Sequence, residues 1–159
     1  MGLEIERKFL VRSDAWREAS EGGVRLRQGY VVAQPDRSVR VRLDRSDGAA
    51  TLTLKGATRG ATRSEFEYSI PSVDAEQILA ELCVGRTIDK TRHRVPHANH
   101  IWEVDEFHGA SEGLVVAEIE LGSESESFER PEWLGEEVTD DPRYLNANLV
   151  RNPRPSRGA

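Results

Sequence analysis

Charged residues stand at alternate positions in several segments of this chain, as acidic pairs and as basic pairs. In an extended strand, residues i and i+2 point to the same face, so each pair places like charges side by side. Like charges that are neighbours in a sheet destabilise it. Basic pairs therefore suit a polyanion, and carboxylate pairs suit a hard divalent cation. The clearest pairs are Glu4 and Glu6, Arg40 and Arg42, Lys90 and Arg92, and Glu118 and Glu120.

Lysine is rare among the basic residues. Of 22 basic residues, only Lys8, Lys55 and Lys90 are lysine, and the rest are arginine. A compact ammonium suits phosphate as a point charge, whereas arginine offers a planar fork. The three retained lysines are thus a hint of phosphate contacts. Charge is also uneven along the chain, at net +5 over residues 1–63 and net −11 over residues 64–159, which favours a site containing both signs.

The elements that would position these charges are strands. Alternation of polar and apolar residues predicts about eight of them, separated by turn signals such as Gln34-Pro35-Asp36 and Ser46-Asp47-Gly48. Short spacing between strands favours antiparallel hairpins, and so a mainly β sheet or barrel. The segments lie around residues 4–9, 25–30, 39–43, 51–55, 63–70, 87–95, 102–105 and 118–121.

Helical signals are few. One helix is predicted between Ser72, a suitable N-cap residue, and Gly85, a suitable stop. A second, short helix is expected after Thr139, and residues 151–159 are expected to be a disordered tail. Because no repeat or linker is visible, we expect a single domain over residues 1–150. The apolar stripe of the first helix consists of Ile78, Leu79, Leu82 and Cys83.

Composition excludes several classes of protein. The formal net charge of −6 argues against a nucleic-acid partner, because that affinity comes from neutralising phosphates. No apolar run is long enough to span a membrane, and the charged N-terminal segment does not resemble a signal peptide. A single cysteine excludes an internal disulfide and a cysteine-based metal site. We therefore expect a cytoplasmic protein, and nothing in the pattern specifies its oligomeric state.

The pattern alone leaves two arrangements open. In the first, the charged faces of the strands point to solvent and the apolar faces form the core. In the second, the sheet closes and the charges point inward. Natural surfaces usually mix signs, whereas here whole strands carry one sign, and this segregation is typical of a site that binds a polyanion and cations.

The order of motifs resembles one family. Glu4-Ile5-Glu6-Arg7-Lys8 forms an E-x-E-x-K motif of the kind that opens members of the CYTH superfamily, also called triphosphate tunnel metalloenzymes. LRQGY, VRVRL, LTLK, RSEFEYSI, DKTRH, WEVDEFHG, AEIEL and W-x-GEEVT…Y-x-N follow in family order, to about Leu149. The resemblance is to the short bacterial branch that hydrolyses inorganic tripolyphosphate. It implies an eight-stranded antiparallel closed barrel with a few flanking helices and inward-facing charges.

The resemblance also implies residue roles, with Mg²⁺ or Mn²⁺ as cofactor and a small-molecule triphosphate as substrate. Catalytic roles fall to Lys90, Tyr30 and Glu6. The residues expected to bind phosphate are Lys8, Arg27, Arg40, Arg42, Lys55, Lys90 and Arg92. The expected metal ligands are Glu4, Glu6, Glu118 and Glu120, with Glu65, Glu67, Glu103 and Asp105 as further candidates.

Other functions fit parts of the same pattern. A class IV-type adenylate cyclase shares the tunnel and the opening motif, but must also grip adenine and ribose, and no extra aromatic or polar cluster is evident for that. A nucleoside or thiamine triphosphatase stays open. A non-catalytic polyphosphate-binding module would keep the basic strands and lose the metal carboxylates, which are intact here.

Overall fold

The computed structural model describes residues 2–155, half of which lie in β-strands. Three short α-helices and two 3₁₀ turns connect or cover the strands: α1 (Trp16–Ala19), α2 (Ser72–Glu81), η1 (Gly109–Ser111), η2 (Pro142–Tyr144) and α3 (Asn146–Leu149). The strands are β1 (Leu3–Val11), β2 (Gly23–Gln34), β3 (Arg37–Asp44), β4 (Ala50–Gly56), β5 (Thr62–Ile70), β6 (Val84–His97), β7 (His100–Phe107), β8 (Val115–Glu120) and β9 (Leu134–Glu137).

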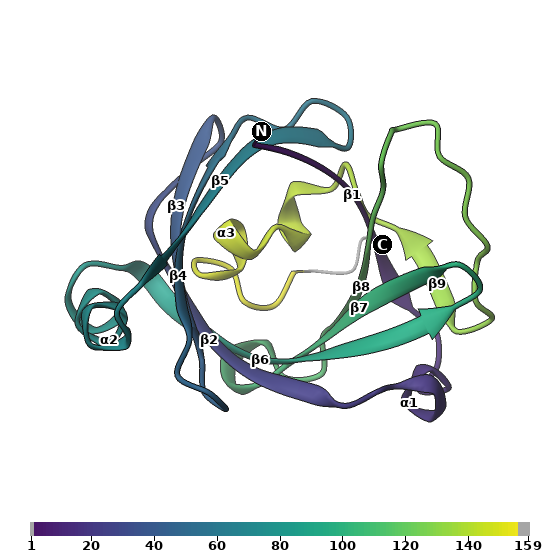
Figure 1. Ribbon diagram of the computed structural model, residues 1–159, viewed down its shortest axis with the longest axis horizontal. Helices are drawn as coiled ribbons and strands as arrows, with labels where there is room; N and C mark the ends of the chain where they lie inside the picture. The colour runs from purple at the N-terminus through teal and green to yellow at the C-terminus, as the bar shows by residue number, and fades with distance from the viewer. Residues whose placement is uncertain (1, 156–159) are drawn as a thin grey trace.

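Eight of these strands close into an antiparallel barrel (Figure 1). The sheet runs β5-β4-β3-β2-β6-β7-β8-β1, and a short ladder between β1 and β5, from Leu3 to Ile5, completes the ring. The extra strand β9 pairs with the far end of β1, at Phe9 and Val11. The predicted eight-stranded closed barrel is confirmed, with β9 as an addition that no alternation signalled.

The barrel carries apolar side chains on much of its outer face. Phe9, Trp102 and Val104 belong to one buried cluster outside the sheet, which Trp16 of α1 and Trp133 cover. A second cluster lies between β3 and α2. Because strands alternate their faces, burying these residues outside turns their charged neighbours inward. Of the two arrangements that the sequence allowed, the structure has the inward one.

The C-terminal segment fills one end of the barrel. In Figure 1, η2 and α3 lie inside the ring of strands. Leu149 and Val150 pack there with Tyr30, Ile88 and Phe107, which line the same end of the barrel. This apolar half leaves the other half of the interior to the charged residues.

Local details differ from the sequence-based expectations. Pro71, not Ser72, is the N-cap residue of α2, and no side chain caps the helix. The helix ends at Glu81, so Gly85 lies within β6 instead of closing the helix. Gly85 has a φ of +66°, and a Cβ there would come within 2.6 Å of the Val150 carbonyl oxygen. The glycine therefore lets the C-terminal segment approach the strand.

Part of the segment expected to be a tail makes contacts. Arg151 donates to the Ala33 carbonyl oxygen at 3.0 Å, and Ser111 donates to the Pro153 carbonyl oxygen at 2.8 Å. The remainder of that expectation, residues 156–159, lies outside the described residues. Within residues 2–155, no helix has the length and apolar character needed to cross a membrane.

Candidate active site

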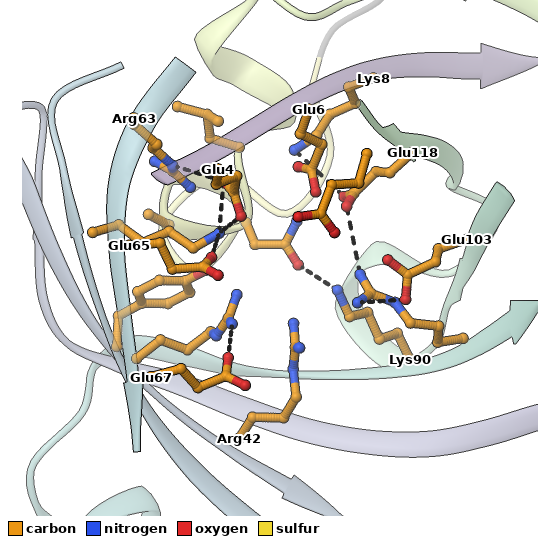
Figure 2. Close-up of a pocket in the computed structure, with 18 residues that line it drawn as sticks. Glu4, Glu6, Lys8, Arg42, Arg63, Glu65, Glu67, Lys90, Glu103 and Glu118 are labelled. Atoms are coloured by element: carbon orange, nitrogen blue, oxygen red, sulfur yellow. Dashed lines mark hydrogen bonds and ion pairs between the residues drawn. The ribbon is translucent and has the colours of Figure 1, made fainter. Parts of the chain in front are cut away.

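The charged half of the barrel encloses a cavity of about 240 Å³. Acidic and basic side chains from around the ring point into it (Figure 2). Its floor is the C-terminal segment, at Leu145, Asn146 and Ala147. The sequence-predicted residues that line it are Glu4, Glu6, Lys8, Tyr30, Arg40, Arg42, Lys55, Glu65, Glu67, Lys90, Arg92, Glu103, Glu118 and Glu120.

Strand register brings these residues together. Lys8 of β1 is the Cα partner of Glu118 on β8, and Glu6 is the partner of Glu120. Arg92 of β6 is in the same way opposite Asp105 on β7. Residues that are partners in an antiparallel pair share a face, so the two-residue alternation seen in each strand becomes one continuous charged surface inside the barrel.

On the β4–β5 side, the buried carboxylate of Glu4 and the partly exposed Glu65 share the ammonium of Lys55. Lys55 Nζ lies 3.0 Å from a Glu4 oxygen and 3.1 Å from a Glu65 oxygen, and Arg63 Nε lies 3.2 Å from Glu4. Burial alone would raise the pKa of Glu4, but hydrogen bonding with Glu65 and the charges of Lys55 and Arg63 lower it to about 2. The shared contact with Glu4, together with burial, raises the pKa of Glu65.

On the β6–β7–β8 side, the ion pairs are more deeply buried. Lys90, 1% exposed, donates to Asp105 at 2.7 Å, and Arg92 donates to both oxygens of Asp105 at 2.8 and 2.9 Å. Burial lowers the pKa of Lys90 to about 7 in spite of the opposing effect of Asp105, with Arg92 and Arg42 contributing. Burial opposes ionisation of Asp105 too, but the two cations hold its pKa well below its usual range.

Burial also affects two arginines of β3, Arg40 and Arg42. The pKa of Arg42 falls to about 9, because burial and the nearby charges of Arg40 and Arg92 disfavour its cation. Arg40 donates to Thr53 Oγ1 at 3.3 Å through Nη2. Its Nε is buried and finds no acceptor among residues 2–155. A buried donor without a partner is costly, so this guanidinium is suited to an anion bound in the cavity.

The comparison with known families agrees with this geometry. The sequence profile described as the CYTH domain matches residues 2–151. The chain belongs to the CYTH family. That match spans the whole barrel and the C-terminal segment that closes it.

Several proteins that are similar to this CYTH chain are named inorganic triphosphatases. It is 50% identical over 153 residues to an inorganic triphosphatase of Acetivibrio thermocellus, with 96% of each chain covered. This chain is also similar to an inorganic triphosphatase of known crystal structure. The two sequences are 34% identical, the TM-score is 0.64, and the match covers 92% of this chain and 93% of the other. The structure of a proposed adenylate cyclase from Bacillus halodurans is 20% identical, has a TM-score of 0.59 and covers 78% and 84%, which shows a shared fold alone.

The carboxylates of this CYTH cavity fit a hard cation in their chemistry. Glu6 and Glu120 are strand partners, and the carboxylate of neither forms a hydrogen bond or a close ion pair within the described chain. Burial and the neighbouring carboxylates Glu118 and Glu4 raise the pKa of Glu6 well above its usual value. Burial and the charges of Glu4 and Glu103 raise the pKa of Glu120. Oxygen ligands of this type suit Mg²⁺ or Mn²⁺, although no three carboxylates among residues 2–155 converge on one point.

Two sequence-predicted site residues lie outside the cavity lining. Arg27 is opposite Leu43 and Asp89, on the outer face of β2 that Gly29 shares, where a Cβ on Gly29 would meet Cys83 of the segment after α2. The alternation itself separates Arg27 from the inward residues Gln28 and Tyr30, because neighbours in a strand point to opposite faces. Asp105 is fully buried behind Lys90 and Arg92, so it meets the cavity through them.

Sequence reasoning also missed two cavity residues. Arg63 belongs to the same alternating run as Glu65 and Glu67, so the pattern did signal it. Asn146 ends the Y-x-N motif of the family resemblance, which signalled the residue, but only the folding of the C-terminal segment into the barrel brings it to the cavity.

Proposed function

We propose that this chain hydrolyses inorganic tripolyphosphate to pyrophosphate and phosphate with the help of a divalent metal ion. The observation that carries the proposal is a cavity lined by basic groups from around the barrel wall, next to carboxylates that lack cationic partners. Triphosphate tunnel enzymes of the CYTH family are metal-dependent, and the named relatives are inorganic triphosphatases.

Substrate binding would proceed by exchange of ion partners. In the structure, Lys55, Lys8 and Arg92 are each paired with carboxylates. A phosphate chain has several anionic oxygens and would take over these cations, leaving the carboxylates uncompensated. Phosphoryl transfer depends mainly on such positioning and charge neutralisation. The orphaned Arg40 Nε would gain an acceptor in the same step.

The released carboxylates, together with the unpaired carboxylates of Glu6 and Glu120, would hold the metal ion. Glu4, Glu6, Glu118 and Glu120 are the proposed ligands, and Glu65, Glu67 and Glu103 are further candidates. When bound, a divalent ion would neutralise charge on the phosphate oxygens and orient the water that attacks phosphorus.

We assign Lys90 and Tyr30 to the scissile phosphate. Lys90 uses two donors on Asp105 and Asn146, and an ammonium has a third. Tyr30 lines the cavity, and its hydroxyl forms no hydrogen bond with any described residue. Both groups can therefore donate to phosphate oxygens, where negative charge grows during transfer.

The size of the cavity favours an inorganic chain over a nucleotide. Its floor is closed by residues 145–147, and Tyr30 is its single aromatic side chain within the described lining. A cyclase or a nucleoside or thiamine triphosphatase would need room and stacking surface for the organic group.

We also propose that residues 1–150 act as one domain and that the reaction is cytoplasmic, in keeping with the unpaired Cys83.

The test is phosphate release from tripolyphosphate, pyrophosphate, ATP and thiamine triphosphate, each with Mg²⁺, with Mn²⁺ and with EDTA. We expect tripolyphosphate with metal to be turned over fastest and pyrophosphate to inhibit, because it reaches fewer of the basic groups. Full activity in EDTA, or equal turnover of pyrophosphate and tripolyphosphate, would contradict the proposal.

A further inference from the structure

Two buried amides link the floor of the cavity to its basic residues. Gln28 of β2 is fully buried, and its Oε1 accepts from Arg42 Nε at 2.9 Å. Gln28 Nε2 donates to Asn146 Oδ1 at 3.0 Å, and Lys90 Nζ donates to the same oxygen at 2.8 Å. Figure 2 shows Lys90 and Arg42 on the same side of the cavity.

The neighbours of these amides fix which way each one points. Guanidinium and ammonium groups only donate hydrogen bonds. Arg42 therefore requires the oxygen of Gln28, and Gln28 must turn its NH₂ group to Asn146. Asn146 in turn must present its oxygen to two donors, Gln28 and Lys90, so its own NH₂ group points elsewhere.

That NH₂ group has no acceptor in the protein. Asn146 Nδ2 forms no hydrogen bond with any residue of the described range, 2–155. Nδ2 is not sealed from solvent either, because the buried side-chain donors without a partner in that range are Trp16 Nε1, Arg40 Nε and Trp102 Nε1. Because Asn146 lines the charged cavity, an unpaired and accessible Nδ2 is open to an anion bound there.

We propose that Asn146 binds the substrate directly, donating from Nδ2 to a phosphate oxygen at the inner end of the polyphosphate chain. This inference rests on the proposed function. It makes the C-terminal segment a part of the binding site as well as its floor. The Arg42–Gln28 contact acts as a positioning device, since it holds the amide of Asn146 with its donor toward the cavity.

The test compares kcat/KM for tripolyphosphate with Mg²⁺ in four proteins: wild type, Asn146→Ala, Asn146→Asp and Asn148→Ala. Asn146→Ala loses the donor, and we expect kcat/KM to fall about tenfold, or about 1.4 kcal/mol. Asn146→Asp keeps an acceptor for Lys90 and Gln28 but presents an anionic oxygen to the phosphate. We expect a larger loss, about 100-fold.

Asn148→Ala is the matched control. Asn148 lies on the same short helix, its Nδ2 donates to the Pro142 carbonyl oxygen at 2.6 Å, and it does not line the cavity. We expect its kcat/KM to stay within about twofold of wild type. All variants are checked by thermal unfolding.

Three outcomes would overturn the assignment of Asn146: wild-type kcat/KM in Asn146→Ala, a smaller loss in Asn146→Asp than in Asn146→Ala, or an equal loss in Asn148→Ala. Because Asn146→Asp is isosteric and keeps both buried contacts, it tests the assignment even if the alanine variant unfolds. If wild type itself releases no phosphate from tripolyphosphate, the proposed function fails. Turnover by wild type with an unaffected Asn146→Ala removes only the inference.

Discussion

The two sides of the cavity both carry acidic and basic side chains, but the outer faces of their strands are covered to different extents. We call β6, β7 and β8 the backed wall, because Trp102 and Val104 on its outer face are buried under α1 and the segment around Trp133. We call β4 and β5 the thin wall, because Phe66 and Tyr68 on its outer face are 50% and 58% exposed. Inside, the Lys90–Asp105 pair of the backed wall is sealed, at 1% and 0% side-chain exposure, whereas Lys55 of the thin wall is 8% exposed and its partner Glu65 is 27% exposed.

This difference suggests a division of labour. Buried charges are held in one arrangement by their partners and by dense packing, so the backed wall should fix the position of the phosphate chain. The Lys55–Glu65 pair is nearer to water, which weakens and screens an ion pair, so the thin wall should exchange this partner more readily when substrate enters.

The outer faces should differ most in stability. Trp102→Ala removes a fully buried ring from the backed wall, and we expect the free energy of unfolding to fall by about 3–5 kcal/mol. Phe66→Ala on the thin wall should cost less than about 1 kcal/mol, since half of the ring is already in water. Denaturant unfolding of both variants measures this, and equal losses would mean that the two walls are supported alike.

The inner ion pairs should follow the same order. Asp105→Asn leaves Lys90 and Arg92 buried without their carboxylate, and we expect a loss of about 3 kcal/mol of unfolding free energy. Glu65→Gln, the counterpart on the thin wall, should cost less than about 1 kcal/mol. The measurement is urea unfolding without added metal. A Glu65→Gln variant as unstable as Asp105→Asn would remove the distinction.

The strand that joins the two walls, β1, carries two of the four proposed metal ligands, Glu4 and Glu6. Glu6→Gln on β1 removes charge from a carboxylate that lacks a cationic partner, and we expect kcat to fall at least ~100-fold with the fold intact. Glu112→Gln, in an exposed turn, is the control and should leave kcat unchanged. Steady-state assays across a metal titration check this, and normal turnover by Glu6→Gln would exclude a metal role for that residue.

The smallest expected contrast lies between two lysines. Lys90→Arg keeps the charge but forces a bulkier group between Asp105 and Asn146, so we expect kcat to fall about tenfold or more. Lys55→Arg, beside the partly exposed Glu65, should lose less. Hydrolysis of tripolyphosphate by the two variants decides the point. If both match wild type, the scarcity of lysine says nothing about function.

Most of the site could be predicted because strand periodicity is local. Alternation along β1, β3, β6 and β8 already groups the residues that share each inner face. The same rule should have excluded Arg27, which stands next to the inward Gln28, and should have included Arg63. Arg27 was assigned from its place in the LRQGY motif of the family resemblance and not from the face of the strand on which it lies.

The sequence by itself determined the eight barrel strands, the charged residues that share a face of each, and the family, because these follow from neighbouring residues and their order. Only the tertiary structure decided which face turns inward, since that depends on distant groups such as Trp16 and Trp133 covering the outside of the barrel. It also placed Asn146 beside Lys90, which lies 56 residues away in the chain. No local pattern encodes such a contact, because it forms only when the C-terminal segment packs its apolar residues into the open end of the barrel.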